Sequence, residues 1–563
     1  FDVICLLMNM NAIKHVIEQV MNKWNREKKP FLVLYLFLVA LNAPLIFLRL
    51  TNQYDGLWNQ DDYMAGEWEL SNGRWFWPYL DHARFGISLD PLPNLLAVAG
   101  FVGMVLLLAR AMRLSWNKRT YLASMLFLAS TGITCQLSFS YMSITFAFSA
   151  VMAVLGVNLV TLAAERRDQK YGIRSILIAG VVIAVMMGCY QASLGLSCLT
   201  ALFYVMKKLT GADESIDSND TTSDDLIQSR KEALHFAGKM FISLLVGGVF
   251  YLAGLNLHEK VFHVEPADYQ GFSDLTPAYL IVHLPRGIVH AYETFYATFW
   301  NGTFLIFRGQ RTLGVRILYL IPIAVLLILF LRTVKKNLVN GILFLVCTIL
   351  IPVFANSFYL LAPESECHIQ MIVPMTLVIP LIYMLGGSCW PSDVSSGRAE
   401  KRFKEKMCSC AVTLGCTALL LASAAMSLTD AYAMYAGRQA TGTLAREILH
   451  VMNAQGYDYA NGSVMILGNA KESQTFSITE LYEKANEYAK YGSWTDEVGL
   501  NNQIWEKVYS DYLRLKVSFV TRDTLETINN MPELSQMPCY PAVGSAQNIY
   551  GVEVIKLTGV NHR

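Results

Sequence analysis

Two adjacent aspartates, Asp61 and Asp62, stand in an acidic and aromatic stretch, 60–68, that directly follows the first long apolar run of the chain. A carboxylate that lies between a bilayer and aromatic side chains loses hydration, which raises its pKa toward values suited to proton abstraction. Neighbouring side chains on a helix or strand point apart, so one aspartate can face a substrate while the other holds local structure. Asp61 and Asp62 are therefore candidate catalytic bases. The alternative is a solvated loop in which an aspartate caps a short helix.

Several arginines fall in the same stretch, or in later loops that we expect on the same side of a membrane. The planar guanidinium can hold a lipid phosphate through two parallel hydrogen bonds. The alternative for each arginine is an anchor to ordinary phospholipid headgroups. The candidates for phosphate binding are Arg74, Arg84, Arg286, Arg308 and Arg311.

Other polar or aromatic residues expected at this face are candidates for binding a substrate. They are Glu67, Trp68, Asp81, Tyr190, Gln191, Glu364, Glu366 and His368. Tyr190 and Gln191 could instead serve only to end a helix, and one histidine beside two glutamates is too few ligands to indicate a metal. The sequence therefore indicates no cofactor, and it leaves a divalent metal open.

The elements that must position these residues are membrane-spanning helices. The chain has 563 residues, of which 54% are hydrophobic and only 16% are charged, whereas a soluble protein has about 25% charged residues. A spanning helix needs about 20 mostly apolar residues. Eleven stretches qualify approximately, at 31–49, 92–110, 120–137, 141–164, 175–190, 192–206, 238–256, 313–332, 338–355, 368–387 and 409–427. No basic run with interleaved aromatics suggests a nucleic-acid partner, and the eleven scattered cysteines form no disulfide framework.

Lysine and arginine gather in alternate loops, which predicts a cytoplasmic N-terminus. We expect three parts: a cytoplasmic amphipathic segment 1–30, a multi-spanning domain 31–427 with outer loops 50–91 and 257–312, and an outer domain 428–563. Aromatics at near-helical spacing in loop 257–312 predict an interfacial amphipathic helix. In the outer domain, predicted helices 443–452 and 478–488 alternate with predicted strands 463–467, 517–521 and 552–557. This alternation is typical of a small α/β domain.

Three separated motifs resemble the Gtr-type glucosyltransferases, the glucosyl transferase II family. They are NQDDY…GEW…SNGRWF with DPLPN, then GCYQASLG, and MPCYPAVGSAQNIYGVEVIKL near the C-terminus. These enzymes decorate bacterial O-antigen and related surface glycans. The resemblance implies a GT-C-type fold in the bacterial cytoplasmic membrane and a carboxylate base in the first outer loop, which falls on Asp61 or Asp62. It also implies inverting transfer of a hexose, glucose first of all, from a polyprenyl-phosphate carrier to a cell-surface glycan.

The same resemblance implies membrane lipids as surroundings, and a separate donor-synthesising glycosyltransferase and a flippase as suppliers. Glu364, Glu366 and His368 match no motif of that family, so their roles stay open. One alternative function is a lipid-linked glycan flippase or transporter, which would need ionisable residues or broken helices within the spans. Others are a surface-polysaccharide polymerase or ligase and a structural membrane protein with an outer binding domain. The early acidic motif favours the transferase.

Overall fold

The computed structural model describes residues 27–51, 56, 59, 63–83, 91–165, 169–211, 223–267, 277–302, 313–389, 399–468, 470 and 498–559. Five residues named above lie outside the described residues: Asp61, Asp62, Arg84, Arg308 and Arg311. The predicted helix 478–488 and most of segment 1–30 also lie outside them.

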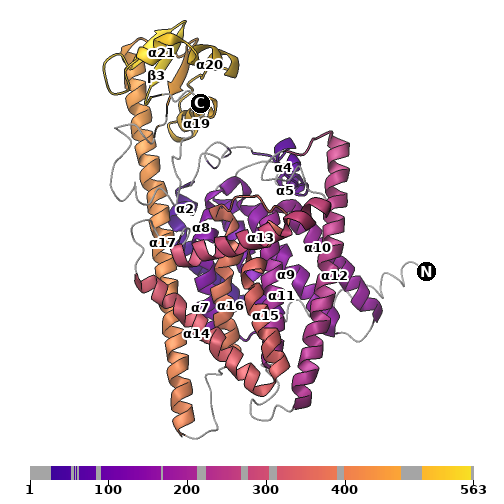
Figure 1. Cartoon of the computed structure of the whole chain (residues 1–563). Coiled ribbons are helices and arrows are strands. Elements are labelled where there is room, and N and C mark those ends of the chain that lie inside the picture. Colours follow the sequence, from indigo (N-terminus) through magenta and orange to yellow (C-terminus); the bar gives the residue numbers. More distant parts are fainter. Residues whose placement is uncertain are drawn as a thin grey trace, which may run out of the picture.

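The described chain is an upright helix bundle joined to a small domain with a sheet (Figure 1). We call the end of the bundle that faces this C-terminal domain the upper end. The long helices are α6 (Leu92–Ala111), α9 (Ser143–Glu165), α10 (Gln169–Cys189), α11 (Leu194–Thr210), α12 (Ser223–Phe262), α14 (Leu313–Lys336), α15 (Leu338–Ala355), α16 (Val373–Cys389) and α17 (Ala399–Ala454). Within the described residues, these nine are long and apolar enough to cross a membrane. The chain is therefore a multi-pass membrane protein.

Two of the predicted spans are broken helices. Span 120–137 is α7 (Lys118–Leu128) followed by α8 (Thr131–Ser138), with a bend of 48° between them. The first span is helical over 27–41, turns at Asn42, and resumes as α2 (Ala43–Phe47). Pro44 explains this break, because proline cannot donate a backbone hydrogen bond inside a helix. If both broken helices cross the membrane, the number of spans is the eleven that the sequence predicts. That number stays a prediction.

Short polar side chains satisfy the backbone and side-chain groups near these breaks. The Thr134 hydroxyl donates to Oδ1 of Asn42 (3.0 Å), and the amide of Asn42 donates to the carbonyl of Leu38 (3.3 Å). The Ser427 hydroxyl on α17 donates to the carbonyl of Ala129 at the α7–α8 bend (2.9 Å). Such bonds are what irregular backbone needs at membrane depth.

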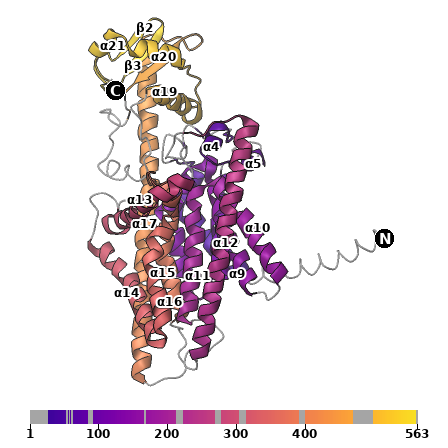
Figure 2. The same cartoon turned by 45° about the vertical axis from the view of Figure 1, so that its right-hand side comes forward.

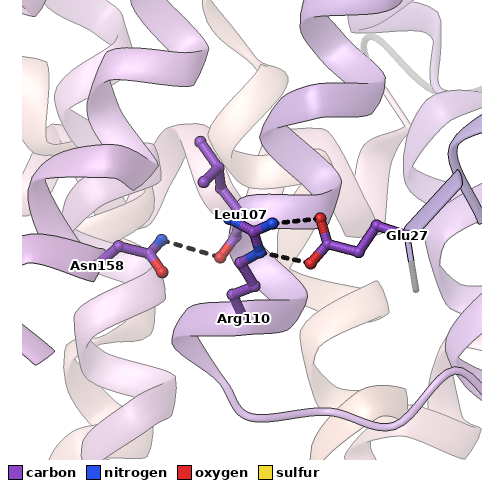
Figure 3. A network of polar contacts seen from close by, with 4 residues as sticks. All are labelled: Glu27, Leu107, Arg110 and Asn158. Atoms are coloured by element: carbon purple, nitrogen blue, oxygen red, sulfur yellow. Dashed lines mark hydrogen bonds and ion pairs between the residues drawn. The ribbon is translucent and has the colours of Figure 1, made fainter. Parts of the chain in front are cut away.

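At the lower end, a polar network ties three helices together (Figure 3). The guanidinium of Arg110 on α6 forms an ion pair with Glu27, with a 2.6 Å bond from Nη2. The amide of Asn158 on α9 donates to the carbonyl of Leu107 (2.9 Å). The start of the first helix is thereby fixed to α6, which is in turn fixed to α9.

Helix α13 (Pro277–Tyr296) lies across the bundle near its upper end (Figures 1 and 2). One face packs on the bundle. Nδ1 of His290 bonds to the carbonyl of Pro363 (2.8 Å). The buried side-chain amide of Asn356 donates to the main-chain carbonyl of Ala291 (2.9 Å). Its other face exposes apolar side chains, with Ile281 at 74% and Val282 at 71% exposure. The helix predicted in loop 257–312 is thus present, and its two faces have the character of an interfacial helix.

Helix α17 runs across the predicted boundary between domains at 427–428, which stays a prediction. It runs without interruption for 56 residues, and the predicted helix 443–452 is its last part. At about 1.5 Å per residue, α17 is far longer than the roughly 30 Å hydrocarbon core of a bilayer. Its C-terminal part therefore projects from the bundle and supplies Leu444, Ile448 and Met452 to the core of the C-terminal domain.

The C-terminal domain contains one small mixed sheet. Strand β3 (Val552–Lys556) lies between β1 (Ser463–Leu467), which is parallel to it, and β2 (Ala546–Ile549), which is antiparallel. Predicted strands 463–467 and 552–557 are present, whereas 517–521 forms only an isolated bridge between Val464 and Phe519. The remaining described elements are α19 (Val498–Lys507), the π-helical turn η7 (Val508–Tyr512), α20 (Arg522–Asn529) and α21 (Pro532–Gln536).

Asp430 on α17 is a carboxylate buried at 1% exposure, and neither of its oxygens has a hydrogen-bond partner among the described residues. Burying such a group without a partner costs free energy. We expect Asp430→Leu to stabilise the folded protein by about 1–3 kcal/mol, measured as a rise in the midpoint of thermal unfolding in detergent. Ser427→Ala, one turn away, removes a satisfied bond and should lower that midpoint. A less stable Asp430→Leu protein would mean that this carboxylate has an essential partner.

Candidate active site at the upper end of the bundle

The first loop after the broken helix is fixed to the upper ends of α10 and α12 by a tryptophan. The main-chain N–H of Phe76 donates to the carbonyl of Gly188 (2.8 Å). A Cβ atom added at Gly188 or at Gly254 would come within 2.8 Å of the Trp75 ring. Two glycines on neighbouring helices therefore make the space that Trp75 fills.

Gln191 fastens the loop at a second point. Its amide nitrogen lies 2.8 Å from the carbonyl of Asn72 and 3.2 Å from the hydroxyl of Tyr251, and Gln191 itself is buried. Gly73 follows with φ of +76°, and a Cβ there would lie 2.4 Å from the Tyr251 hydroxyl. Only glycine combines that conformation with so close an approach. The Gln191 amide nitrogen, predicted to bind substrate, thus holds the loop in this structure.

A histidine makes the third attachment. Nδ1 of His258 lies 2.6 Å from the carbonyl of Gly254, and Nε2 lies 2.6 Å from the hydroxyl of Tyr79. A carbonyl can only accept, so Nδ1 carries a proton, and the neutral ring accepts from Tyr79 at Nε2. His258 also packs on Trp75, with ring centroids 5.1 Å apart. The loop that follows the acidic pair is therefore held by α12 as well as by α10.

Glu69 holds the chain immediately after the acidic pair. This side chain lies on α4 (Glu67–Ser71) and is buried at 4% exposure. One of its oxygens accepts from the main-chain N–H of Gly66 (2.8 Å) and the other from the Tyr63 hydroxyl. Burial and the adjacent Glu69 carboxylate raise the pKa of Tyr63 above its ordinary value. Tyr63 therefore stays neutral and remains a donor.

Asp81 on α5 (Trp77–Ala83) is the second buried carboxylate of this region, at 2% exposure. Its Oδ2 accepts from the main-chain N–H of Ala65 (2.9 Å). Asp81 was predicted to bind substrate, and in the structure it restrains the segment that follows Asp61 and Asp62 in sequence. Glu69 and Asp81 together fix residues 63–66, which have no regular secondary structure of their own.

We expect Glu69→Gln to loosen this segment. A glutamine can accept only through one oxygen, so its NH₂ group would face one of the two donors, at a cost of about 1–3 kcal/mol. Amide hydrogen exchange at residues 63–66 should speed up by about tenfold for each 1.4 kcal/mol, with global unfolding little changed. Glu67→Gln, an exposed neighbour in the same helix, is the matched control. Unchanged exchange in Glu69→Gln would show that Glu69 does not restrain the segment.

Arg74 lies between two aromatic rings. Its Cζ is 5.8 Å from the ring centroid of Trp77 and 5.8 Å from that of Tyr190, within the range of a cation–π contact. Its Nε is buried and has no hydrogen-bond partner in the described part of the chain. Tyr63, Trp77 and Tyr141 form an aromatic cluster beside it, with the Tyr63 and Tyr141 rings 4.8 Å apart. The geometry leaves a guanidinium that is oriented by ring faces and has an unpaired Nε donor among the described residues.

Arg286 differs from Arg74 in its surroundings. It lies on α13, its side chain is 58% exposed, and its Nη2 forms an ion pair with Glu364 (2.7 Å). The structure thus brings together Arg286 and Glu364, which were predicted for different roles. Glu67, Trp68 and Glu366 are exposed, and His368 is half-buried. Among the described residues, no group of three or more His, Cys, Asp or Glu could hold a metal ion.

A tightly closed crevice, with no room for a water molecule, adjoins Tyr190 at the same end of the bundle. It lies between the 3₁₀ turn η2 (Gln191–Ser193) and the segment of η5 (Ile369–Met371) with the start of α16. Its polar lining includes Gln136 and Gln370, which the sequence analysis missed. Glu69 and Trp75 were also missed as site-building residues. Only the paired glycines, Gly188 and Gly254, could have pointed to the place of Trp75.

Comparison with protein families finds one match, to the family model described as glucosyl transferase GtrII, over residues 45–386. This range is more than half of the chain and contains the first loop, Tyr190, α13 and the crevice. The C-terminal motif that also resembles the family lies beyond it. No curated protein and no solved structure matches the chain. The chain therefore belongs to the glucosyl transferase GtrII family.

Proposed function

We propose that this membrane glycosyltransferase moves a hexose, glucose first of all, from a polyprenyl-phosphate carrier to a cell-surface glycan such as O-antigen. The observation that carries the proposal is Arg74, held between Trp77 and Tyr190 with no acidic partner among the described residues. It stands in the same loop as the acidic pair, whose following segment is held by two buried carboxylates. A fixed cation in the same loop of the sequence as candidate bases suits displacement of a phosphate from a sugar.

The chemistry is an inverting displacement. Asp61 or Asp62 takes the proton of an acceptor hydroxyl, and that oxygen attacks the anomeric carbon from the face opposite the lipid phosphate. The bond from the anomeric carbon to the phosphate oxygen breaks, and polyprenyl phosphate leaves with the bonding electrons. Arg74 stabilises the negative charge that develops on the phosphate. Arg84, Arg308 and Arg311 are further candidates for the same task.

The upper end of the bundle is the outer face of a bacterial cytoplasmic membrane in this proposal. The basis is the positive charge of the alternate loops, which puts the N-terminus inside and the C-terminal domain outside. At that face, the donor must be made and moved across the membrane by other proteins: a donor-synthesising glycosyltransferase and a flippase. The GT-C-type fold remains part of the proposal.

The test is sugar transfer by the purified protein in nanodiscs, with synthetic polyprenyl-phosphate glucose as donor and isolated surface glycan as acceptor. The expected result is a product that carries one added glucose of inverted anomeric configuration. Transfer with retained configuration would contradict the displacement mechanism. No transfer with any polyprenyl-phosphate hexose, despite folded protein, would reject the function and favour a flippase or a polymerase.

A further inference from the structure

The crevice beside Tyr190 is a site to which the proposed function has given no role. Its walls come from four parts of the chain: Gln136 on α8, Ala150 on α9, Tyr190 to Leu196, and Gln370 to Pro374. None of the lining residues is charged. The crevice therefore suits a neutral polar group better than a phosphate or a metal ion.

The amide of Gln136 has a fixed orientation. Gln136 is buried at 3% exposure, and its Nε2 donates to the main-chain carbonyl of Gln370 (2.8 Å). An amide oxygen could not make this bond, because a carbonyl only accepts. Oε1 of Gln136 is thus a buried acceptor, and no donor reaches it within the described residues.

A second buried acceptor lies on the facing segment. Oε1 of Gln370 is also buried and has no hydrogen-bond partner in the described part of the chain. An amide oxygen that loses water without gaining a donor costs free energy. Two such oxygens at one uncharged crevice indicate a ligand that brings hydroxyl donors.

We propose that the crevice is a sugar subsite, in which the amide oxygens of Gln136 and Gln370 accept hydrogen bonds from hydroxyl groups of one hexose. This inference rests on the proposed function, because the sugar belongs either to the lipid-linked donor or to the glycan acceptor. Tyr190 joins the two regions, since it lines the crevice and also packs against Arg74. A sugar in the crevice thus lies next to the arginine that would hold its phosphate.

The crevice must open to admit a sugar ring, because as it stands it has no room even for a water molecule. Met371 is the wall residue that can move most readily, since an unbranched thioether adapts its shape at little cost. Tyr190 offers an apolar ring on the facing wall. Binding is therefore coupled to displacement of Met371.

The test compares equilibrium binding of two probes to the full-length protein in nanodiscs: citronellyl phosphate glucose and citronellyl phosphate without the sugar. The wild-type protein should bind the glucose-bearing probe at least tenfold more tightly. Gln136→Leu and Gln370→Leu should each reduce that preference by about threefold to tenfold, with binding of the bare phosphate unchanged. Gln370→Leu keeps the main-chain carbonyl that Gln136 bonds, so it serves if Gln136→Leu does not fold.

Asn158→Leu is the matched control. It also replaces a half-buried amide that bonds a main-chain carbonyl, but it lies eight residues beyond Ala150 on α9, about 12 Å along the helix. This variant should keep the full preference for the glucose-bearing probe. Competition by methyl glucoside separates the two sources of the sugar.

Loss of the preference in the glutamine variants assigns the crevice to the donor sugar. A retained preference with weakened binding of methyl glucoside assigns it to the acceptor sugar. If the glutamine variants change neither the preference nor the binding of methyl glucoside, the sugar subsite is rejected. This comparison measures binding and not turnover, so it tests the sugar subsite separately from the proposed function. A protein that transfers no sugar can still prefer the glucose-bearing probe, and an active transferase can lack that preference.

Discussion

Replacing Asp61 or Asp62 with asparagine is expected to abolish sugar transfer in at least one of the two variants. Asparagine has nearly the same shape but cannot take a proton, and loss of a general base lowers turnover by about 10²-fold to 10⁴-fold. The following segment should keep its structure, because Glu69 and Asp81 hold it through Gly66 and Ala65. The measurement is the single-turnover rate with polyprenyl-phosphate glucose in nanodiscs.

Glu265→Gln is the matched control for these variants. It is the same kind of change at an exposed position, two residues before Ala267, whose main-chain N–H donates to the carbonyl of Ser71 (3.0 Å). It should alter the rate by less than about threefold. Thermal unfolding of all variants shows whether a slow protein is also a misfolded one. Full activity in both Asp61→Asn and Asp62→Asn would remove both residues as the base and leave the catalytic carboxylate to be found elsewhere in the loop.

The sequence predicted the helices of the bundle well, because long apolar stretches have few alternatives in a bilayer. It could not predict that α17 continues past residue 427, since a helix that leaves the membrane loses its apolar character without ending. The break at Asn42 was readable in principle from Pro44. The bend at Ala129 was harder to read, because Gly132 nearby is only a weak signal and the hydrogen bonds of the bend come from distant helices.

The candidate site was predicted only in part, for a related reason. Residue type indicated Arg74 and Asp81, but type alone cannot tell a carboxylate that binds substrate from one that holds a main-chain N–H. Asp81 holds a main-chain N–H in this structure, and its contact with substrate stays a prediction. Trp75 depends on space left by Gly188 and Gly254, and Gln136 and Gln370 meet only in the folded chain. Such pairings over long sequence distances carry no local signal, so only the structure reveals them.

Replacing Arg74 with alanine is expected to lower kcat/KM for the lipid-linked donor by about 10²-fold to 10³-fold, the usual effect of removing one preorganised group that stabilises developing charge. Trp77 and Tyr190 hold the guanidinium in place, so little reorganisation is needed when the phosphate leaves. Arg74→Lys should recover only part of the loss, because an ammonium keeps the charge but not the planar fork. The acceptor KM should change little.

Arg286→Ala provides the contrast that makes this result specific. Arg286 is largely exposed and already forms an ion pair with Glu364, so its removal should change kcat/KM by less than about threefold. Both variants lose one positive charge at the same end of the bundle, so a general effect on the membrane surface potential would affect them alike. A loss in Arg286→Ala equal to that in Arg74→Ala would mean that net charge, rather than the guanidinium between Trp77 and Tyr190, supports donor use. A large loss in Arg74→Ala alone would assign the phosphate contact to Arg74.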